Sequence, residues 1–339
     1  MKRRLARLAA AGHMELIDDE LASPTGTQVR IQVVAAGLCH SETPFFTGDQ
    51  QIPEEDGAHV EPRHVLPDGT LDYPFCLGHE PVGIVEELGP GVRDLKPGDG
   101  VTGLGWVDGH DSFSSHILVR EENLVKVPDG VRLEYALGEP LGCVVNIARI
   151  ASPGFGDAVA VVGCGFMGLL VVAALAGTPL GHLIAIDLQE ERLQLARGLG
   201  ATVAFNPQEG DVAGEVDALT KGRGVDVAVE ITGRAAGLEL ATRIIRERQA
   251  KVLLASVYVR EPFDIGNQLM SKAPVLIAAH PVYSHEMTED VRRGVWGYAQ
   301  GLLPVERLVT HRFGLERIQE AMELSTSQAD GYIKGIVTP

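Results

Sequence analysis

Three glycines and one aspartate near the middle of the chain have the types and spacing that bind a dinucleotide. Gly163, Gly165 and Gly168 form a G-x-G-x-x-G pattern between a short apolar run and an apolar segment of helical length. Such glycines permit a tight turn, let a pyrophosphate approach the backbone, and let the helix pack closely on the strand. Asp187 ends the next apolar run, about 20 residues after the last glycine, where a carboxylate binds the ribose hydroxyls of an adenosine. The order strand, glycines, helix, strand and acid predicts a dinucleotide site.

The same aspartate bears on the choice of cofactor. A carboxylate at Asp187 repels a 2′-phosphate, and the next two residues carry no positive charge, so we expect NAD rather than NADP. Arg192 follows closely enough to weaken this preference. Phe166 and Met167, between the second and third glycines, join the expected cofactor-binding residues. The alternative to a dinucleotide site is that the glycines form a glycine-rich connection in an unrelated α/β sheet.

Five further residues are of the types that bind zinc, and they are Cys39, His79, Glu80, Glu139 and Cys143. Catalytic zinc takes about three protein ligands and keeps one position open for substrate. None of the five has the tight spacing of a structural zinc site. A buried thiol that packs like a small apolar group, or a hydrogen-bonded core histidine, is therefore an alternative reading.

The elements that must position these residues change character along the chain. Residues 1–145 read as short strands separated by Gly and Pro turns, with strands expected at 5–10, 14–17, 29–34, 82–88, 115–119 and 124–127. Beyond that point strands at 159–162, 183–186, 203–205, 225–230, 251–255 and 275–278 alternate with helices at 166–176, 190–198, 215–220 and 235–245. This alternation predicts a parallel sheet covered on both faces. Two amphipathic helices, 288–300 and 315–325, and a strand at 332–337 follow.

Composition excludes several classes of protein. At 339 residues and a net charge of −17, the chain lacks the basic surface that nucleic acids or anionic membranes require. No apolar run reaches the roughly 18 residues of a membrane-spanning helix. Arg7 interrupts the N-terminal apolar stretch, so we expect no signal peptide and a cytoplasmic location. The four cysteines are scattered and predict no disulfide framework.

Together the motifs resemble those of the zinc-containing medium-chain dehydrogenase/reductases, the alcohol and polyol dehydrogenase type. The matching stretches, in order, are Gly37-Leu38-Cys39-His40-Ser41-Glu42, Gly78-His79-Glu80, Pro97-Gly98-Asp99, Glu139-Pro140-Leu141, the Gly163–Gly168 loop and Ile333-Lys334. The resemblance implies an α/β fold in which a GroES-like β-rich catalytic domain accompanies a doubly wound Rossmann nucleotide-binding domain. The implied limits are 1–145 for the catalytic domain, 146–282 for the NAD-binding domain, and 283–339 for a segment that completes the catalytic domain.

The implied activity is hydride transfer between NAD and a primary or secondary alcohol, such as a polyol, a sugar alcohol or a small alcohol, or the matching carbonyl compound. Zinc would act as the Lewis acid, in a cleft between the two domains. The family's structural-zinc lobe carries four cysteines, whereas residues 103–115 carry none. We therefore expect one catalytic zinc and no structural zinc.

Residue roles follow from the resemblance. Cys39 and His79 match the first two zinc ligands, and Glu80 matches a residue that binds the metal or lies just behind it. The third ligand is Glu139, as in polyol-type members, or Cys143, as in alcohol-type members; Glu-Pro-Leu favours Glu139.

Other matched residues concern protons and the cofactor. Ser41 matches the hydroxyl that accepts the alcohol's proton, and Glu42 matches the acid behind the zinc ligands. His40 and Lys334 match contacts to the cofactor pyrophosphate, although each could be an ordinary surface charge. Pro44 replaces a histidine that ends the proton relay in alcohol-type members.

The substrate pocket and the partners are less determined. Phe45, Phe46, Trp106 and Asn146 could line the cleft, or serve packing. The acidic excursion 48–74 is expected to cap the cleft, and its His59 and His64 are candidate bases. The resemblance implies a homodimer or homotetramer that pairs through 274–281. Two alternatives remain, namely a zinc-free enoyl or quinone reductase of the same superfamily and a non-catalytic nucleotide-binding protein.

Overall fold

The computed structural model describes residues 1–48, 70–109, 111–257, 261–281, 284–329 and 331–339. By its internal contacts the chain divides into two compact units. Unit 1 comprises Met1–Gly142, Thr288–Gly301 and Val305–Pro339, and unit 2 comprises Cys143–Met287 and Leu302–Pro304. These limits differ from the predicted domain limits by a few residues, and the predicted limits stay a prediction. No helix in the described ranges has both the length and the apolar character to cross a membrane.

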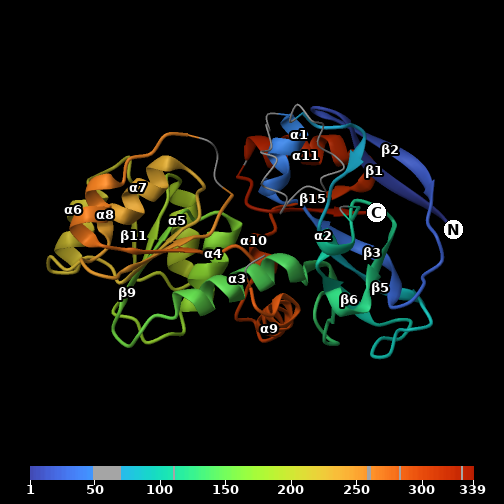
Figure 1. Cartoon of the computed structure of the whole chain (residues 1–339), viewed down its shortest axis with the longest axis horizontal. Coiled ribbons are helices and arrows are strands. Elements are labelled where there is room, and N and C mark those ends of the chain that lie inside the picture. Colours follow the sequence, from blue (N-terminus) through green and yellow to red (C-terminus); the bar gives the residue numbers. More distant parts are fainter. Residues whose placement is uncertain (49–69, 110, 258–260, 282–283, 330) are drawn as a thin grey trace. The chain divides into compact units, whose positions relative to one another are not determined.

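Unit 1 is built on two β-sheets (Figure 1). A small sheet has the order β2-β1-β4, from His13–Glu20, Lys2–Ala10 and Phe75–Cys76. The larger sheet has the order β15-β16-β3-β5-β6-β8, from His311–Gly314, Gly335–Thr338, Gln28–Gly37, Glu80–Leu88, Gly100–Gly103 and Leu124–Lys126, and β7 (His116–Arg120) also pairs with β3. Its helices are α1 (Thr43–Thr47), α2 (Gly105–Asp108), most of α9 (Met287–Ala299), α10 (Val305–Leu308) and α11 (Ile318–Ser327).

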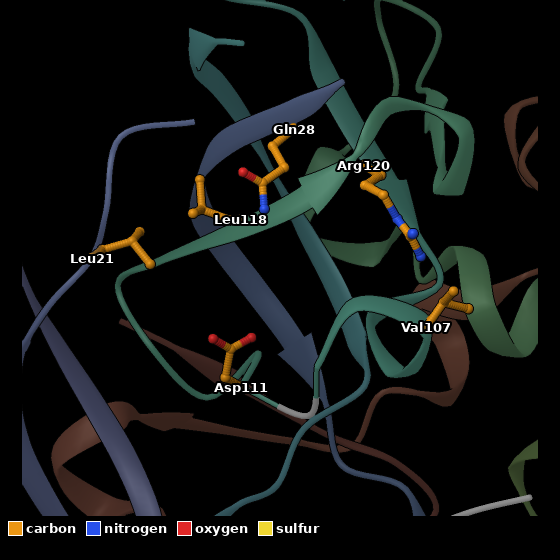
Figure 2. A pocket seen from close by; sticks show the side chains of 6 residues that line it. All are labelled: Leu21, Gln28, Val107, Asp111, Leu118 and Arg120. Atoms are coloured by element: carbon orange, nitrogen blue, oxygen red, sulfur yellow. The ribbon is translucent and has the colours of Figure 1, made fainter. Parts of the chain in front are cut away.

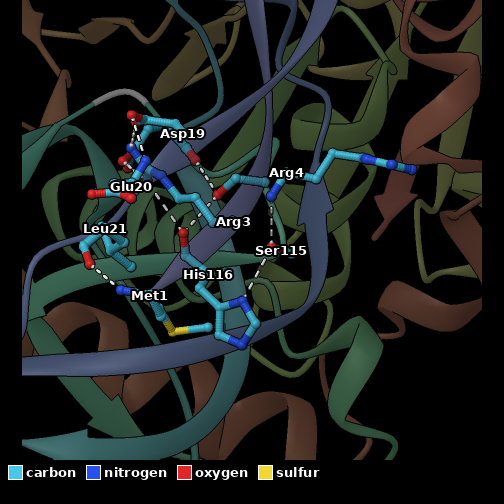
Figure 3. Close-up of polar contacts among 10 residues, drawn as sticks. Met1, Arg3, Arg4, Asp19, Glu20, Leu21, Ser115 and His116 are labelled. Atoms are coloured by element: carbon cyan, nitrogen blue, oxygen red, sulfur yellow. Dashed lines mark hydrogen bonds and ion pairs between the residues drawn. The ribbon is translucent and has the colours of Figure 1, made fainter.

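The first strand is tied to its surroundings by polar contacts at the chain's beginning (Figure 3). The amino group of Met1 donates to the carbonyl of Leu21 at 2.7 Å. The guanidinium of Arg3 bonds Asp111 at 2.6 Å and Asp19 at 3.2 Å. Since its side chain is only 9% exposed, these carboxylates offset the cost of burying its charge. They join the β1–β2 hairpin to the segment that precedes β7.

Unit 2 contains the expected parallel sheet, in the order β11-β10-β9-β12-β13-β14. Its strands are Val203–Phe205, His182–Ile186, Ala158–Val162, Val227–Glu230, Lys251–Leu254 and Val275–Ala278, and all adjacent pairs are parallel. Helices α4 (Phe166–Leu175) and α5 (Glu190–Gly198) contact each other and β10, whereas α7 (Ala235–Ile244) contacts β12 and α6 (Val212–Leu219). From β9 the chain first adds β10 and β11 on one side of that strand, and then adds β12, β13 and β14 on its other side. This is the doubly wound arrangement.

Five helices of the described chain were missed by the sequence analysis, namely the short α1, α2 and α10 and the two longer helices α8 and α3. α8 spans Gly266–Lys272, and α3 spans Gly138–Ala151, beginning in unit 1 and continuing into unit 2. The start of α3 carries two glycines and Pro140, residues that favour helices weakly. A proline is tolerated in the first turn of a helix. A Cβ on Gly138 or Gly142 would lie 2.9 or 2.8 Å from Val291 of α9, so these glycines permit close helix packing.

Candidate metal and dinucleotide sites

The ends of three neighbouring strands bring the predicted metal ligands together in unit 1. β3 pairs antiparallel with β5 so that Gly37 faces Glu80, and β16 pairs with β3 so that Ile336 faces Gly37. Cys39 lies just beyond the end of β3, and His79 lies just before β5. Lys334 immediately precedes β16. Residues far apart in sequence therefore meet at one end of these three strands, inside the larger sheet.

Cys39, His79 and Glu80 each offer a ligand atom, and these atoms all lie within 4.8 Å of one another. His79 and Glu80 are buried, and Cys39 is half-buried. Within the ranges that the structure describes, this is the one group of three or more His, Cys, Asp or Glu side chains close enough to hold a metal ion. A thiolate, an imidazole and a carboxylate are zinc ligands.

Glu42 orients the His79 ring. Its Oε1 accepts from the backbone N–H of Gly78 at 2.7 Å and lies 2.9 Å from Nδ1 of His79. This bond leaves Nε2 as the nitrogen for a metal. Burial lowers the pKa of His79, but the negative charges of Glu42 and Cys39 outweigh it and raise that pKa well above its usual range. The surroundings of the ring thus favour a positive charge.

Glu80 is held between a cation and a glycine. The ammonium of Lys334 donates to its Oε1 at 2.6 Å, and both side chains are buried. Burial lowers the pKa of Lys334, yet the negative charges of Glu80 and Cys39 raise it above the ordinary value. A Cβ on Gly37 would lie 1.8 Å from Oε2 of Glu80, so only glycine leaves room for this carboxylate.

The donor set fits a zinc ion. The second carboxylate oxygens of Glu42 and Glu80 are buried and have no hydrogen-bond partner in the described part of the chain. The carboxylates of Glu42 and Glu80 face the single ammonium of Lys334, so the cluster accommodates one further positive charge, a proton on His79 or a metal ion. A buried negative charge is costly unless a positive charge compensates it. Cys39 and His79, with Glu80 close by, would hold the metal ion.

Ser41 and His40 lie next to this cluster in sequence and differ in exposure. The hydroxyl of Ser41 donates to Sγ of Cys39 at 3.2 Å, and Ser41 is half-buried. His40 is exposed, and its Nδ1 lies 3.3 Å from both Thr43 Oγ1 and Gln328 Nε2. Lys334 is not the surface charge that the sequence allowed, because it is buried against Glu80. A phosphate contact for His40 or Lys334 stays a prediction.

The proposed third ligands lie on α3. Glu139 is 8% exposed in the first turn of the helix, and Cys143 is half-buried one turn later. Glu139 belongs to unit 1, whereas Cys143 belongs to unit 2. Neither is a member of the Cys39, His79 and Glu80 group. The assignment of either as a metal ligand stays a prediction.

The glycine loop of unit 2 has the geometry that its pattern predicts. Gly163 follows β9 with a φ of +102°, and α4 begins one residue after Gly165. A Cβ on Gly168 would lie 1.9 Å from the carbonyl oxygen of Gly163, so the third glycine lets α4 pack against the turn. A Cβ built on Gly165 would meet no atom within 4 Å, so the backbone is open in the direction in which that Cβ would point. The loop therefore presents the start of α4 to a phosphate group. Phe166 is buried and Met167 half-buried in the first turn of that helix.

Asp187 is bound to this loop. Its Oδ2 accepts from the N–H of Cys164 at 2.7 Å, and its Oδ1 accepts from the N–H of Gln189 at 2.9 Å. The carboxylate is thus fixed at the end of β10 beside the glycine turn, where a dinucleotide's adenosine ribose would lie. Leu188, which follows, is 56% exposed.

The predicted pocket residues have other roles where the structure describes them. Phe45 and Phe46 are buried in the core of unit 1 and serve packing. The amide of Asn146 donates to the carbonyl of Ala279 at 3.2 Å, which ties α3 to the end of β14. The side chain of Trp106 lies outside the described residues. The same holds for residues 49–69, and hence for His59, His64 and nearly all of the acidic excursion.

A surface cavity of about 470 Å³ in unit 1 lies elsewhere (Figure 2). The six residues that line it are Leu21, Gln28, Val107, Asp111, Leu118 and Arg120. None of them is a predicted site residue. Asp111 is already paired with Arg3. We assign this cavity no role in the chemistry.

Comparison with known proteins finds matches to two parts of the chain. Residues 25–129 match the family model of the alcohol dehydrogenase GroES-like domain, and residues 167–293 match that of the zinc-binding dehydrogenases. The chain is 27% identical to sorbitol dehydrogenase of Bacillus subtilis, over 92% of this chain and 90% of that protein. It is also 27% identical to L-threonine 3-dehydrogenase of Pyrococcus horikoshii, over 94% of each. The crystal structure of 2R,3R-butanediol dehydrogenase from Bacillus subtilis superposes with a TM-score of 0.83 at 26% identity, covering 99% of both chains.

Proposed function

Because the chain belongs to the zinc-containing medium-chain dehydrogenase/reductase family, we propose that it is a zinc- and NAD-dependent dehydrogenase of alcohols or polyols. It is an oxidoreductase with a GroES-like domain and a Rossmann domain. The observation that carries the proposal is the grouping of Cys39, His79 and Glu80 at one end of β3 and β5, inside the larger sheet of unit 1. The glycine loop of unit 2 supplies the other requirement, a binding site for the dinucleotide that donates or accepts the hydride.

Zinc would be held by Cys39 and His79, with Glu80, Glu139 or Cys143 as the further ligand. When bound, zinc acts as a Lewis acid and lowers the pKa of an alcohol at the open position. Glu42 keeps the Nε2 of His79 available by binding Nδ1. Lys334 holds the Glu80 carboxylate in place.

Ser41 is the proposed first acceptor of the substrate's proton. Its hydroxyl lies beside Sγ of Cys39, within the immediate surroundings of the cluster. A hydroxyl can accept and donate at once, so it can pass a proton to the cofactor ribose. This step requires that a cofactor held by unit 2 meets the cluster in unit 1, which is part of the proposal.

We propose NAD as the cofactor because Asp187 places a fixed carboxylate where NADP would carry a phosphate. The substrate class is an alcohol with a neighbouring polar group. Sorbitol, butanediol and threonine, from the names of the relatives, are all compounds of this kind. The location in the cytoplasm stays a prediction.

We also propose a homodimer or homotetramer that pairs through β14. This strand is at the end of its sheet, and its Val275 and Leu276 are 42% and 40% exposed. Leu269 and Met270 of α8 are exposed close to it in sequence. An edge strand with apolar side chains is a surface that a second strand commonly covers.

Metal analysis together with an alcohol screen tests the proposal. The purified full chain should contain about one zinc per chain and should form NADH from one or more alcohols or sugar alcohols. Cys39→Ser and His79→Ala should each lose zinc and turnover while retaining NADH binding. These two readouts separate the metal centre from the dinucleotide site.

Two other results would replace the proposal. A zinc-free protein that reduces an enone or quinone would be a reductase of the same superfamily. Intact binding of NADH without any turnover would indicate a non-catalytic nucleotide-binding protein. Both alternatives disagree with the clustered zinc-type ligands.

A further inference from the structure

A buried carboxylate stands at the switch point of the unit 2 sheet. β10 and β11 lie on one side of β9, and β12, β13 and β14 lie on the other. Ligands of doubly wound sheets bind at the carboxyl ends of the two strands that flank this point. Glu230 is the last residue of β12, opposite Val162 of β9, and its exposed fraction is 0%. A charge with this burial requires strong hydrogen bonds.

Thr232 supplies two of these bonds. Its backbone N–H donates to Oε1 of Glu230 at 2.8 Å, and its hydroxyl donates to the same oxygen. The hydroxyl also accepts from the N–H of Arg234 at 3.1 Å. Thr232 itself is exposed. The carboxylate thus fixes both the backbone and the side-chain rotamer of a residue at the open end of the sheet.

The fixed rotamer points a methyl group at the glycine loop. A Cβ built on Gly163 would lie 2.8 Å from Cγ2 of Thr232 and 3.2 Å from its backbone nitrogen. On the other side, a Cβ on Gly237 of α7 would lie 2.3 Å from Oγ1 of Thr232 and 2.5 Å from Oε1 of Glu230. The Thr232 side chain therefore lies close to both the turn at Gly163 and the first turn of α7, although Thr232 is exposed elsewhere.

We propose that the Glu230–Thr232 pair positions the cofactor, because it sets the placement of the Gly163 turn that receives the pyrophosphate. Glu230 acts through Thr232 and is a positioning residue. The inference rests on the proposed dinucleotide function, and it adds a determinant of cofactor affinity that the glycine pattern does not include. Without the hydroxyl bond, the Thr232 side chain can rotate and the turn loses its support.

Thr232→Val tests the pair, because valine keeps the branched shape but places a methyl group against the carboxylate. The dissociation constant of NADH, from a fluorescence titration, should rise about tenfold. The KM for NAD should rise with it, while kcat at saturation changes less than about twofold. Thr232→Ser restores the hydroxyl, and its NADH affinity should remain within about threefold of the original. Thr178→Val is the matched control, since its hydroxyl bonds only the carbonyl of Leu175 among the contacts described.

The melting temperature of the cofactor-free protein separates positioning from stability. Because Thr232→Val takes a hydrogen bond from a buried carboxylate, we expect its melting temperature to fall by a few degrees, with the protein still fully folded at the temperature of the titration. Unchanged NADH affinity in this variant would overturn the inference, and so would weaker binding that is explained by unfolded protein at that temperature. If Thr232→Val is not recovered folded, Glu230→Gln decides the matter by the same measurements. A native protein that binds no NADH would refute the proposed function itself, and the inference with it.

Discussion

The ammonium group of Lys334 lies 2.6 Å from Oε1 of Glu80, in the interior of unit 1. The two side chains are 5% and 1% exposed, so neither charge can be hydrated if the other is removed. They lie 254 positions apart in sequence, Lys334 directly before β16 and Glu80 at the start of β5. The pair joins the C-terminal strand to the proposed metal centre.

Lys334→Met should therefore destabilise the metal-free protein by about 3–5 kcal/mol, because it leaves the Glu80 carboxylate buried and uncompensated. Urea unfolding in the presence of a chelator measures this change. The double variant Lys334→Met/Glu80→Leu should lose less than the sum of the two single variants, since their effects are coupled. Additive losses would mean that the two groups do not interact in solution.

Glu42→Gln should weaken zinc binding about 10–100-fold, since Glu42 orients the His79 ring and increases its basicity. Competition with a chromophoric chelator gives the zinc affinity. Glu209→Gln, which alters an exposed side chain of unit 2, is the control. If Glu42→Gln binds zinc as tightly as the control, the imidazole needs no support from this carboxylate.

Asp187→Asn should shift cofactor choice towards NADP. The change keeps one oxygen as an acceptor for a backbone N–H, but it removes the charge that repels a 2′-phosphate. We expect the ratio of kcat/KM for NAD to that for NADP to fall roughly tenfold or more. Glu191→Gln, in the first turn of α5, is a nearby control. An unchanged ratio would show that another residue selects the cofactor.

The four cysteines should differ in their reaction with iodoacetamide. Burial, followed by the charge of Asp111, raises the pKa of Cys76 to about 11, and burial with the charge of Asp187 raises that of Cys164 to about 12. A raised pKa lowers the thiolate fraction at any given pH, to roughly one in a thousand at pH 8 for Cys76. Peptide mass spectrometry of the folded protein should find both thiols unmodified at pH 8.

Zinc should change this pattern at Cys39, and also at Cys143 if that thiol is the further ligand. Cys39 should be alkylated in metal-free protein and protected after zinc is added, while Cys76 and Cys164 become reactive only in denaturant. Labelling of Cys164 in the folded protein at its denatured rate would contradict the burial shown here. Failure of zinc to protect Cys39 would argue against its role as a ligand.

Leu276→Lys should break the proposed contact between subunits. A lysine at the exposed edge of β14 opposes pairing with a second strand, because its charge would have to be buried there. Sedimentation velocity should show a smaller species than the unaltered chain. Leu302→Lys, at another exposed leucine of unit 2, should leave the oligomer intact. Identical sedimentation of the two variants would place the interface elsewhere.

Local patterns were enough to predict the dinucleotide site. The strand, the glycines, the first turn of α4 and Asp187 lie within about 30 residues, and their chemistry depends on backbone geometry that glycine and helix capping impose directly. The doubly wound sheet followed for the same reason, since alternating strands and helices have few ways to pack. By contrast, no local pattern predicted the helix that begins at Gly138, where Gly138 and Gly142 lie close to Val291 of α9.

The residue types and spacing of the chain by themselves determined a dinucleotide loop, an acid at the ribose position, and the resemblance that named Cys39 and His79. Tertiary structure decided which distant groups meet. The register of β3 with β5 and β16 brings Cys39 beside His79 and Lys334 beside Glu80. Pairing between strands depends on contacts across hundreds of residues, and no local pattern encodes them. For the same reason, the burial of Lys334 and the support that Glu230 gives to Thr232 became visible only in the folded chain.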